Sequence, residues 1–88
     1  MGKYVTKDGL MSFYSWMICR HYGKDTPAGD LAWDMTYDRN WPEDNSYKAI
    51  HDHLAYAPGV FSHEPCLCVF ERCWKNYQKF VKNYRINH

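Results

Sequence analysis

Three observations in the sequence predict an all-α fold. The expected structure is a small four-helix bundle in a single domain, which can include a short extra turn. A chain of 88 residues is long enough for one hydrophobic core and too short for two. Its aromatic content of 18% supplies that core, because each buried ring removes about 150–250 Å² from water. Five of the eight phenylalanine and tryptophan residues lie in residues 12–16, 29–34 and 70–77, at the spacing of helices rather than the alternation of strands.

Capping residues delimit the first two helices. Ser12 has the side chain of an N-cap, and the first helix is expected to end just before Gly23. Thr26 is an N-cap followed by proline at the first helical position, which predicts a second helix that runs to about Tyr37. Gly29 is a poor helix former, so we expect it to let another helix approach closely.

Two further helices follow a turn-rich connector at 38–45, from which Trp41 is expected to tuck into the core. Ser46 is the expected cap of the third helix, and residues 57–59 end it. The inner face of this helix is expected to hold Tyr47, Ile50 and Leu54. The fourth helix is expected to begin between Ser62 and Pro65, and its broad apolar stripe places it at the centre of the bundle. The predicted core draws on all four helices: Phe13, Trp16, Leu31, Met35, Ile50, Leu54, Phe70, Trp74 and Tyr77. Rings from the first, second and fourth helices are expected to meet in one dry interior.

The order of these residues resembles the YozE-like family of small bacterial proteins. The elements that carry the resemblance are Phe13-Tyr14-x-Trp16, Gly29-Asp30-Leu31-Ala32-x-Asp34, Asp38, Pro42, Tyr47, Ile50, Leu54 and Phe70-x-x-x-Trp74-x-x-Tyr77. The resemblance implies a SAM-like (sterile-alpha-motif-like) helical bundle, a bacterial origin and no known reaction. It also suggests an N-terminal extension at 1–11, a domain at 12–84 and a C-terminal tail at 85–88.

A net charge of +1 conceals a polarised chain. Residues 1–24 carry a net charge of +3, residues 25–71 carry −7, and residues 72–88 carry +5. Helical spacing groups an acidic set on the second helix, Asp30, Asp34 and Asp38, and a basic set on the fourth helix and tail, Arg72, Lys75, Lys79, Lys82 and Arg85. Two interpretations remain open: faces that are solvated or paired within the molecule, and faces that dock partners.

The sequence offers no catalytic, cofactor-binding or metal-binding residues that we would nominate. His51 and His53 are two apart on a helix and point in nearly opposite directions, so they cannot share one ion. His63, Cys66 and Cys68 lack a second pair at zinc-finger spacing. The spacing of the cysteines on the fourth helix disfavours disulfides, and we expect four free thiols, with Cys68 the most exposed.

These features favour a cytoplasmic, non-catalytic protein-interaction module without cofactor, membrane span or small-molecule substrate. Its partner is an unidentified protein or a second copy of the chain. Nucleic-acid binding through the basic set is the alternative, disfavoured because the isoelectric point is near 7.7 and the acidic segment repels a polyanion. An enzyme built on a Cys–His pair is the third interpretation, and an aromatic core of this size leaves it little cleft volume.

Overall fold

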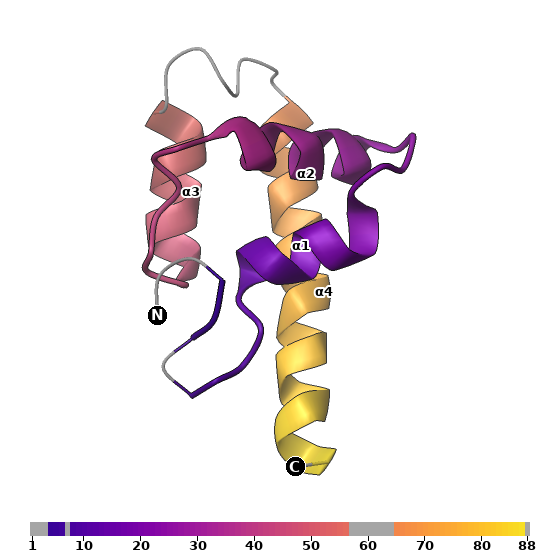
Figure 1. Cartoon of the computed structure of the whole chain (residues 1–88), viewed down its shortest axis with the longest axis vertical. Helices are drawn as coiled ribbons and strands as arrows, with labels where there is room; N and C mark the ends of the chain where they lie inside the picture. Colours follow the sequence, from indigo (N-terminus) through magenta and orange to yellow (C-terminus); the bar gives the residue numbers. More distant parts are fainter. Residues whose placement is uncertain (1–3, 7, 57–64, 88) are drawn as a thin grey trace.

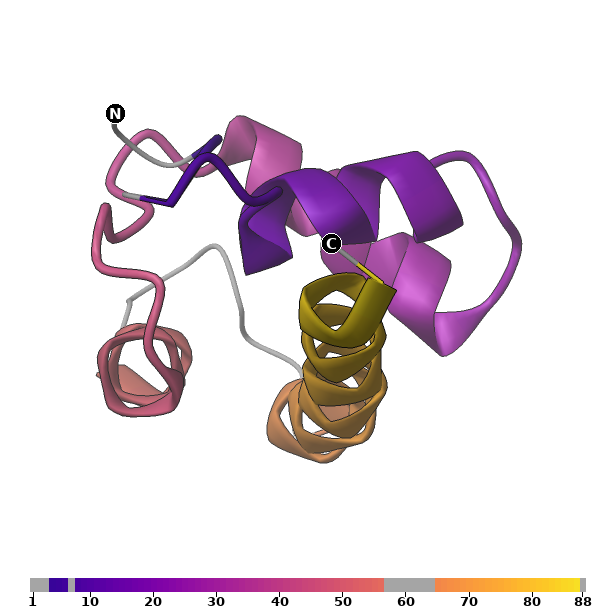
Figure 2. The same cartoon turned by 90° about the horizontal axis from the view of Figure 1, so that it is seen from below.

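Four helices form two layers in the computed structural model, which describes residues 4–6, 8–56 and 65–87. The helices are α1 (Phe13–His21), α2 (Pro27–Tyr37), α3 (Tyr47–Tyr56) and α4 (Pro65–Asn87). Helices α1 and α2 lie side by side across α4, while α3 and α4 run antiparallel in the other layer (Figures 1 and 2). The predicted four-helix all-α fold is confirmed, and the described residues contain no further helix and no strand beyond one isolated bridge between Val5 and Met11.

Hydroxyl caps start the first three helices where the sequence predicts. The side chain of Ser12 accepts a hydrogen bond from the backbone N–H three residues later, at 3.3 Å. Thr26 does the same at 3.0 Å and Ser46 at 3.2 Å, which satisfies donors that the first helical turn leaves unpaired. Gly23 has a φ of 84°, a left-handed conformation that glycine adopts without steric cost, and it lets the chain reverse after α1.

Gly29 allows a close approach of the α1–α2 turn and of the C-terminal end of α1. A Cβ atom built on Gly29 would lie 2.0 Å from the carbonyl oxygen of Lys24 in the turn and 3.0 Å from that of His21, the last residue of α1. Both are backbone atoms and cannot move aside cheaply. The absence of a side chain at Gly29 therefore sets how tightly α2 folds back on α1.

The core is organised around the ring of Phe13, which is fully buried. Its centroid lies 5.5 Å from that of Phe70, 5.3 Å from that of Trp74 and 5.6 Å from that of Tyr77, which joins α1 to α4. Eight of the nine predicted core residues are buried to 4% exposure or less: Phe13, Trp16, Leu31, Met35, Ile50, Leu54, Phe70 and Tyr77. The ninth, Trp74, is only partly buried and packs at the margin of the core.

Two other aromatic residues lie outside the core, contrary to the sequence analysis. Tyr47, expected on the inner face of α3, is 40% exposed, and Trp33 on α2 is 47% exposed. Helix α2 contributes Leu31, Ala32 and Met35 to the interior but no ring. The expectation that rings from α1, α2 and α4 share one dry interior is therefore wrong for α2.

The connector between α2 and α3 is held by a chain of hydrogen bonds that reaches three segments. The side-chain oxygen of Asn45 accepts a bond from the backbone N–H of Phe13 at 2.8 Å. The amide nitrogen of Asn45 donates to the hydroxyl of Tyr77 at 3.0 Å, and that hydroxyl donates to the carbonyl of Met11 at 2.8 Å. Trp41 of the same connector packs into the core with 6% exposure, as expected.

Both ends of the chain join the bundle more closely than the suggested boundaries imply. Leu10, assigned to an N-terminal extension, is buried, and the carbonyl of Tyr4 accepts hydrogen bonds from the backbone of Ser12 and the hydroxyl of Ser15. The expected tail at 85–88 begins as a continuation of α4, which extends to Asn87. The expected helix stop at 57–59 and the candidate cap Ser62 lie outside the described residues.

Candidate functional site

The predicted basic residues form one exposed face on α4. Arg72, Lys75, Lys79 and Lys82 are all exposed, and their spacing places them within an arc of roughly 80° on the side away from the core. We call these four residues the basic face. Among the ion pairs within the described residues, none involves any of the four. Their charge is therefore balanced by solvent and salt rather than by the fold.

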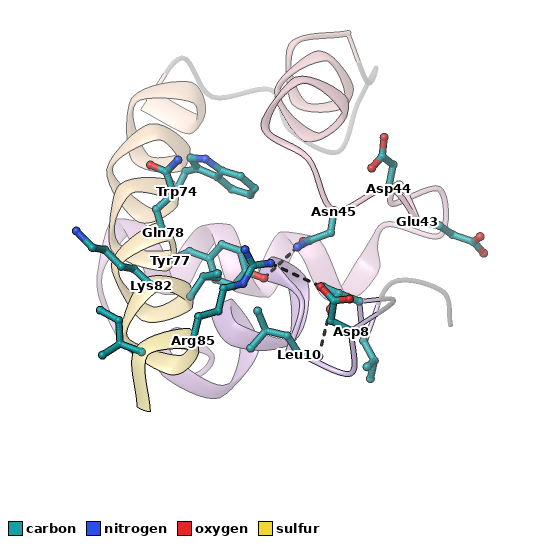
Figure 3. Close-up of a pocket in the computed structure, with 14 residues that line it drawn as sticks. Asp8, Leu10, Glu43, Asp44, Asn45, Trp74, Tyr77, Gln78, Lys82 and Arg85 are labelled. Carbon is teal, nitrogen blue, oxygen red and sulfur yellow. Dashed lines mark hydrogen bonds and ion pairs between the residues drawn. The ribbon is translucent and has the colours of Figure 1, made fainter. Parts of the chain in front are cut away.

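Arg85 lies apart from the basic face, further round α4. Its guanidinium is 3.6 Å from the carboxylate of Asp8, and it reaches towards that residue across a groove (Figure 3). The groove has a volume of about 1180 Å³ and runs between α4, the N-terminal segment and the α2–α3 connector. Glu43 and Asp44 lie on the connector side, so this groove brings opposite charges together. Arg85 thus forms an ion pair within the molecule, at its surface. The predicted basic set therefore divides into the basic face and Arg85.

A smaller pocket opens beside the basic face, between α1 and α4. Its volume is about 500 Å³, and its lining contains the cations Arg20 and Lys79 but no acidic residue: Trp16, Arg20, His21, Asn76, Lys79, Phe80, Asn83 and Tyr84. Burial, with the charges of Lys24 and Arg20, holds the pKa of His21 below its usual value, so His21 is neutral at pH 7. The pocket is suited to an anionic group.

The predicted acidic set on α2 is wrong at Asp38. Its side chain is 5% exposed, and its carboxylate accepts a hydrogen bond from the backbone N–H of Asn40 at 2.9 Å and pairs with the imidazole of His53. The physical reason is that α2 ends at Tyr37, so the backbone at Asp38 is extended and the helical spacing no longer applies. Asp38 joins the connector to α3, and a solvent-facing acidic face retains only Asp30 and the half-buried Asp34.

The outer face of α2 carries an unexpected group of exposed rings, Tyr22, Trp33 and Tyr37, which we call the aromatic surface. Trp33 stacks on Tyr22 from the end of α1, with ring centroids 5.6 Å apart and an 18° angle between the planes. The centroid of Tyr37 lies 5.2 Å from that of Trp33, with the two ring planes at 52°. Trp33 and Tyr37 are four residues apart and therefore adjacent on the helix. Periodicity alone could have placed them opposite Leu31 and Met35, on the solvent side.

The three cysteines whose side chains the structure describes differ in exposure. Cys19 and Cys68 are exposed free thiols, whereas Cys73 is buried, and this burial raises the pKa of its thiol. In the part of the chain that the structure describes, no three His, Cys, Asp or Glu side chains gather closely enough to hold a metal ion. The zinc candidate that included His63 falls outside the described residues. The helices of the described ranges also include none with the length and apolar character that crossing a bilayer requires.

Comparison with known proteins places the chain by fold. The family model described as the YozE SAM-like fold matches residues 12–79, most of the chain. Searches of curated proteins and of solved structures return no match. The matched range starts at the cap of α1 and includes the basic face up to Lys79.

Proposed function

The chain belongs to the YozE SAM-like family, and we propose that it works in the bacterial cytoplasm as a non-catalytic protein-interaction module. The basic face of α4 docks on an acidic surface of a partner protein. One observation carries this proposal: Arg72, Lys75, Lys79 and Lys82 share one solvent face and have no ion-pair partner among the described residues.

The length of α4 and its anchoring in the core favour a docking role for the basic face. The helix has 23 residues, about 34 Å of rigid rod, and its last turns extend beyond the other helices (Figure 1). Its inner face is anchored by the buried side chains of Phe70, Cys73 and Tyr77. The cations are therefore displayed at fixed spacing, and opposing charges on a partner would be steered to them and held in register.

The pocket beside Lys79 indicates how a partner could be engaged. Arg20 from α1 and Lys79 from α4 are the two cations in its lining, and the amides of Asn76 and Asn83 add neutral donors. A glutamate or aspartate side chain of a partner would meet only cationic or neutral groups there. The basic face thus combines a row of exposed charges with one concave position for a carboxylate.

Acidic residues close to α4 favour a protein partner over a nucleic acid. Glu71 lies on α4 next to Arg72 and accepts a hydrogen bond from the hydroxyl of Tyr47, which fixes its carboxylate at the surface. Asp8, Glu43 and Asp44 line the groove beside the C-terminal half of α4, which Lys82 of the basic face and Arg85 also line. A phosphate backbone that followed α4 would meet these carboxylates, whereas a protein surface can match charges of both signs.

Affinity capture from a lysate of the native cells, with and without nuclease, tests the proposal. The bait is compared with a Lys75→Glu/Lys79→Glu variant and with an Arg39→Glu/Lys48→Glu variant that changes net charge equally at exposed positions elsewhere. We expect the wild-type bait to capture a protein both with and without nuclease. The Lys75→Glu/Lys79→Glu variant should lose this protein, and the control variant should retain it. Capture that requires intact nucleic acid, or that is the same for both variants, contradicts it.

Sedimentation equilibrium determines whether the partner is a second copy. Self-association through the basic face would appear at 25 mM salt, weaken at 500 mM salt and disappear in the Lys75→Glu/Lys79→Glu variant. If the chain is a monomer at every concentration and salt, the partner that docks on the basic face is a different protein.

A further inference from the structure

The aromatic surface on α2 leaves apolar area in water that the core does not use. Trp33 is 47% exposed, Tyr37 64% and Tyr22 46%. Each ring therefore presents on the order of 100 Å² to solvent, and together they present roughly 300 Å². Contiguous apolar patches of this size on small monomers are often functional, whereas isolated exposed rings need no explanation.

The three rings already hold one another in place. Tyr22 stacks on Trp33 and Tyr37 contacts it at a tilt, at centroid distances of 5.6 and 5.2 Å. Tyr22 is the C-cap residue of α1, and the other two residues are on α2, so both supporting elements are packed into the bundle. Rings that are fixed before binding lose little conformational entropy when a ligand arrives.

The polar residue that shares this face is an acid. Asp30 is exposed, and it precedes Trp33 by three residues and Tyr37 by seven, so the three side chains lie along one side of α2. Ring faces carry negative electrostatic potential and attract cations, and the carboxylate of Asp30 adds a full negative charge beside them. No described cation lies over these rings. The surface repels phosphates and suits a positively charged, planar group.

We propose that Tyr22, Trp33, Tyr37 and Asp30 form a docking site for an arginine-bearing segment of a partner protein. A guanidinium group can stack flat against the exposed rings while its N–H groups donate hydrogen bonds to the Asp30 carboxylate. Lysine supplies the same charge without the planar face, so the site prefers arginine. Two properties of the site favour arginine: its negative charge and its flat ring surfaces.

This site is separate from the basic face and does not depend on the proposed function. Helices α2 and α4 pack against each other through their inner faces, so their outer faces point away from one another. The two surfaces also have opposite charge. Each can therefore be disabled without altering the other.

Nuclear magnetic resonance titration of the full chain with three synthetic decapeptides tests the proposal. The peptides share a glycine–serine background and contain three arginines, three lysines or three glutamines. We expect the arginine peptide to shift the indole N–H signal of Trp33 and the amide signal of Tyr37, and to bind about threefold more tightly than the lysine peptide. Trp33→Ala and Asp30→Asn should each weaken that binding by about threefold or more.

Matched controls separate a local effect from a general one. Tyr56→Ala removes a ring that is 80% exposed on α3, and Asp44→Asn removes one charge in the groove; neither should change the affinity. Thermal unfolding of each variant verifies that the fold is retained. Equal affinity for the arginine and lysine peptides, or binding that Trp33→Ala leaves unchanged, overturns the proposal. Self-association that Trp33→Ala abolishes would assign the surface to a second copy and overturn the assignment to a different partner.

Discussion

Removing the Tyr77 hydroxyl should destabilise the fold far more than the loss of one oxygen suggests. Tyr77 is 2% exposed, and its hydroxyl links the amide of Asn45 to the carbonyl of Met11, at 3.0 and 2.8 Å. In Tyr77→Phe both groups lose their partner, while the ring keeps its contact with Phe13. Each lost hydrogen bond costs about 1 kcal/mol, with a further penalty for a group left unsatisfied, so we expect a total of about 2–3 kcal/mol.

Urea unfolding followed by circular dichroism measures this loss. The midpoint should fall while the slope m stays constant, because the variant buries nearly the same surface. For a domain of this size the loss corresponds to a decrease in Tm of about 10–20 °C. Tyr56→Phe is the matched control, since Tyr56 is 80% exposed and its hydroxyl can bond to water, and it should change stability by less than about 0.5 kcal/mol.

A double-mutant cycle with Asn45→Ala identifies the cause. Asn45 bonds both Tyr77 and the backbone of Phe13, so Asn45→Ala and Tyr77→Phe should show a coupling of about 1 kcal/mol. A loss for Tyr77→Phe below about 0.5 kcal/mol, or no coupling to Asn45, would refute the claim that this chain of hydrogen bonds holds the connector.

Three further predictions concern backbone packing, thiol reactivity and pH. Gly29→Ala should destabilise the fold by about 2 kcal/mol or more despite the higher helix propensity of alanine, because its Cβ would overlap the carbonyl of Lys24; an increase in Tm would contradict this. Cys73 should react with iodoacetamide about 100-fold more slowly than Cys19 in the native state, since Cys73 is buried, and peptide mapping by mass spectrometry would expose the error if the rates were equal. The folded-state pKa of His21 lies below the unfolded value, so the unfolded state binds the proton more tightly and stability falls as the pH drops through about 6.5. His21→Gln should reduce this fall in Tm between pH 7.5 and 5.5, and an unchanged pH dependence would count against the assignment.

The sequence was most informative where local chemistry decides structure. Hydroxyl caps at Ser12, Thr26 and Ser46 act on N–H groups three residues away, so the starts of α1, α2 and α3 could be predicted without tertiary information. The apolar periodicity of α1 and α4 placed Phe13 and Phe70 correctly in the interior.

Prediction failed where the burial or the contacts of a residue depend on distant parts of the chain. Asp38 continues the spacing of Asp30 and Asp34, but α2 ends one residue earlier, and a distant residue, His53, accounts for its burial. The second helix was expected to contribute a ring to the interior, but Trp33 faces away from Leu31 and is exposed. The bond between Asn45 and Tyr77 spans 32 residues, and no local pattern signals it.

The same distinction applies to the candidate site. Helical spacing was sufficient to group Arg72, Lys75, Lys79 and Lys82, because α4 is continuous over all four. It could not reveal that Arg85 pairs with Asp8, since that contact joins opposite ends of the chain. Nor could it reveal the aromatic surface, which requires Tyr22 from α1 to meet Trp33 from α2.

The most direct test of the basic face as a docking surface is the affinity of the purified captured partner, measured by calorimetry at 50 and 200 mM salt. We expect a loss of about tenfold or more for Lys75→Glu/Lys79→Glu, a weaker complex at the higher salt, and no loss for Arg39→Glu/Lys48→Glu. Equal affinities for the wild-type chain and the Lys75→Glu/Lys79→Glu variant would contradict it.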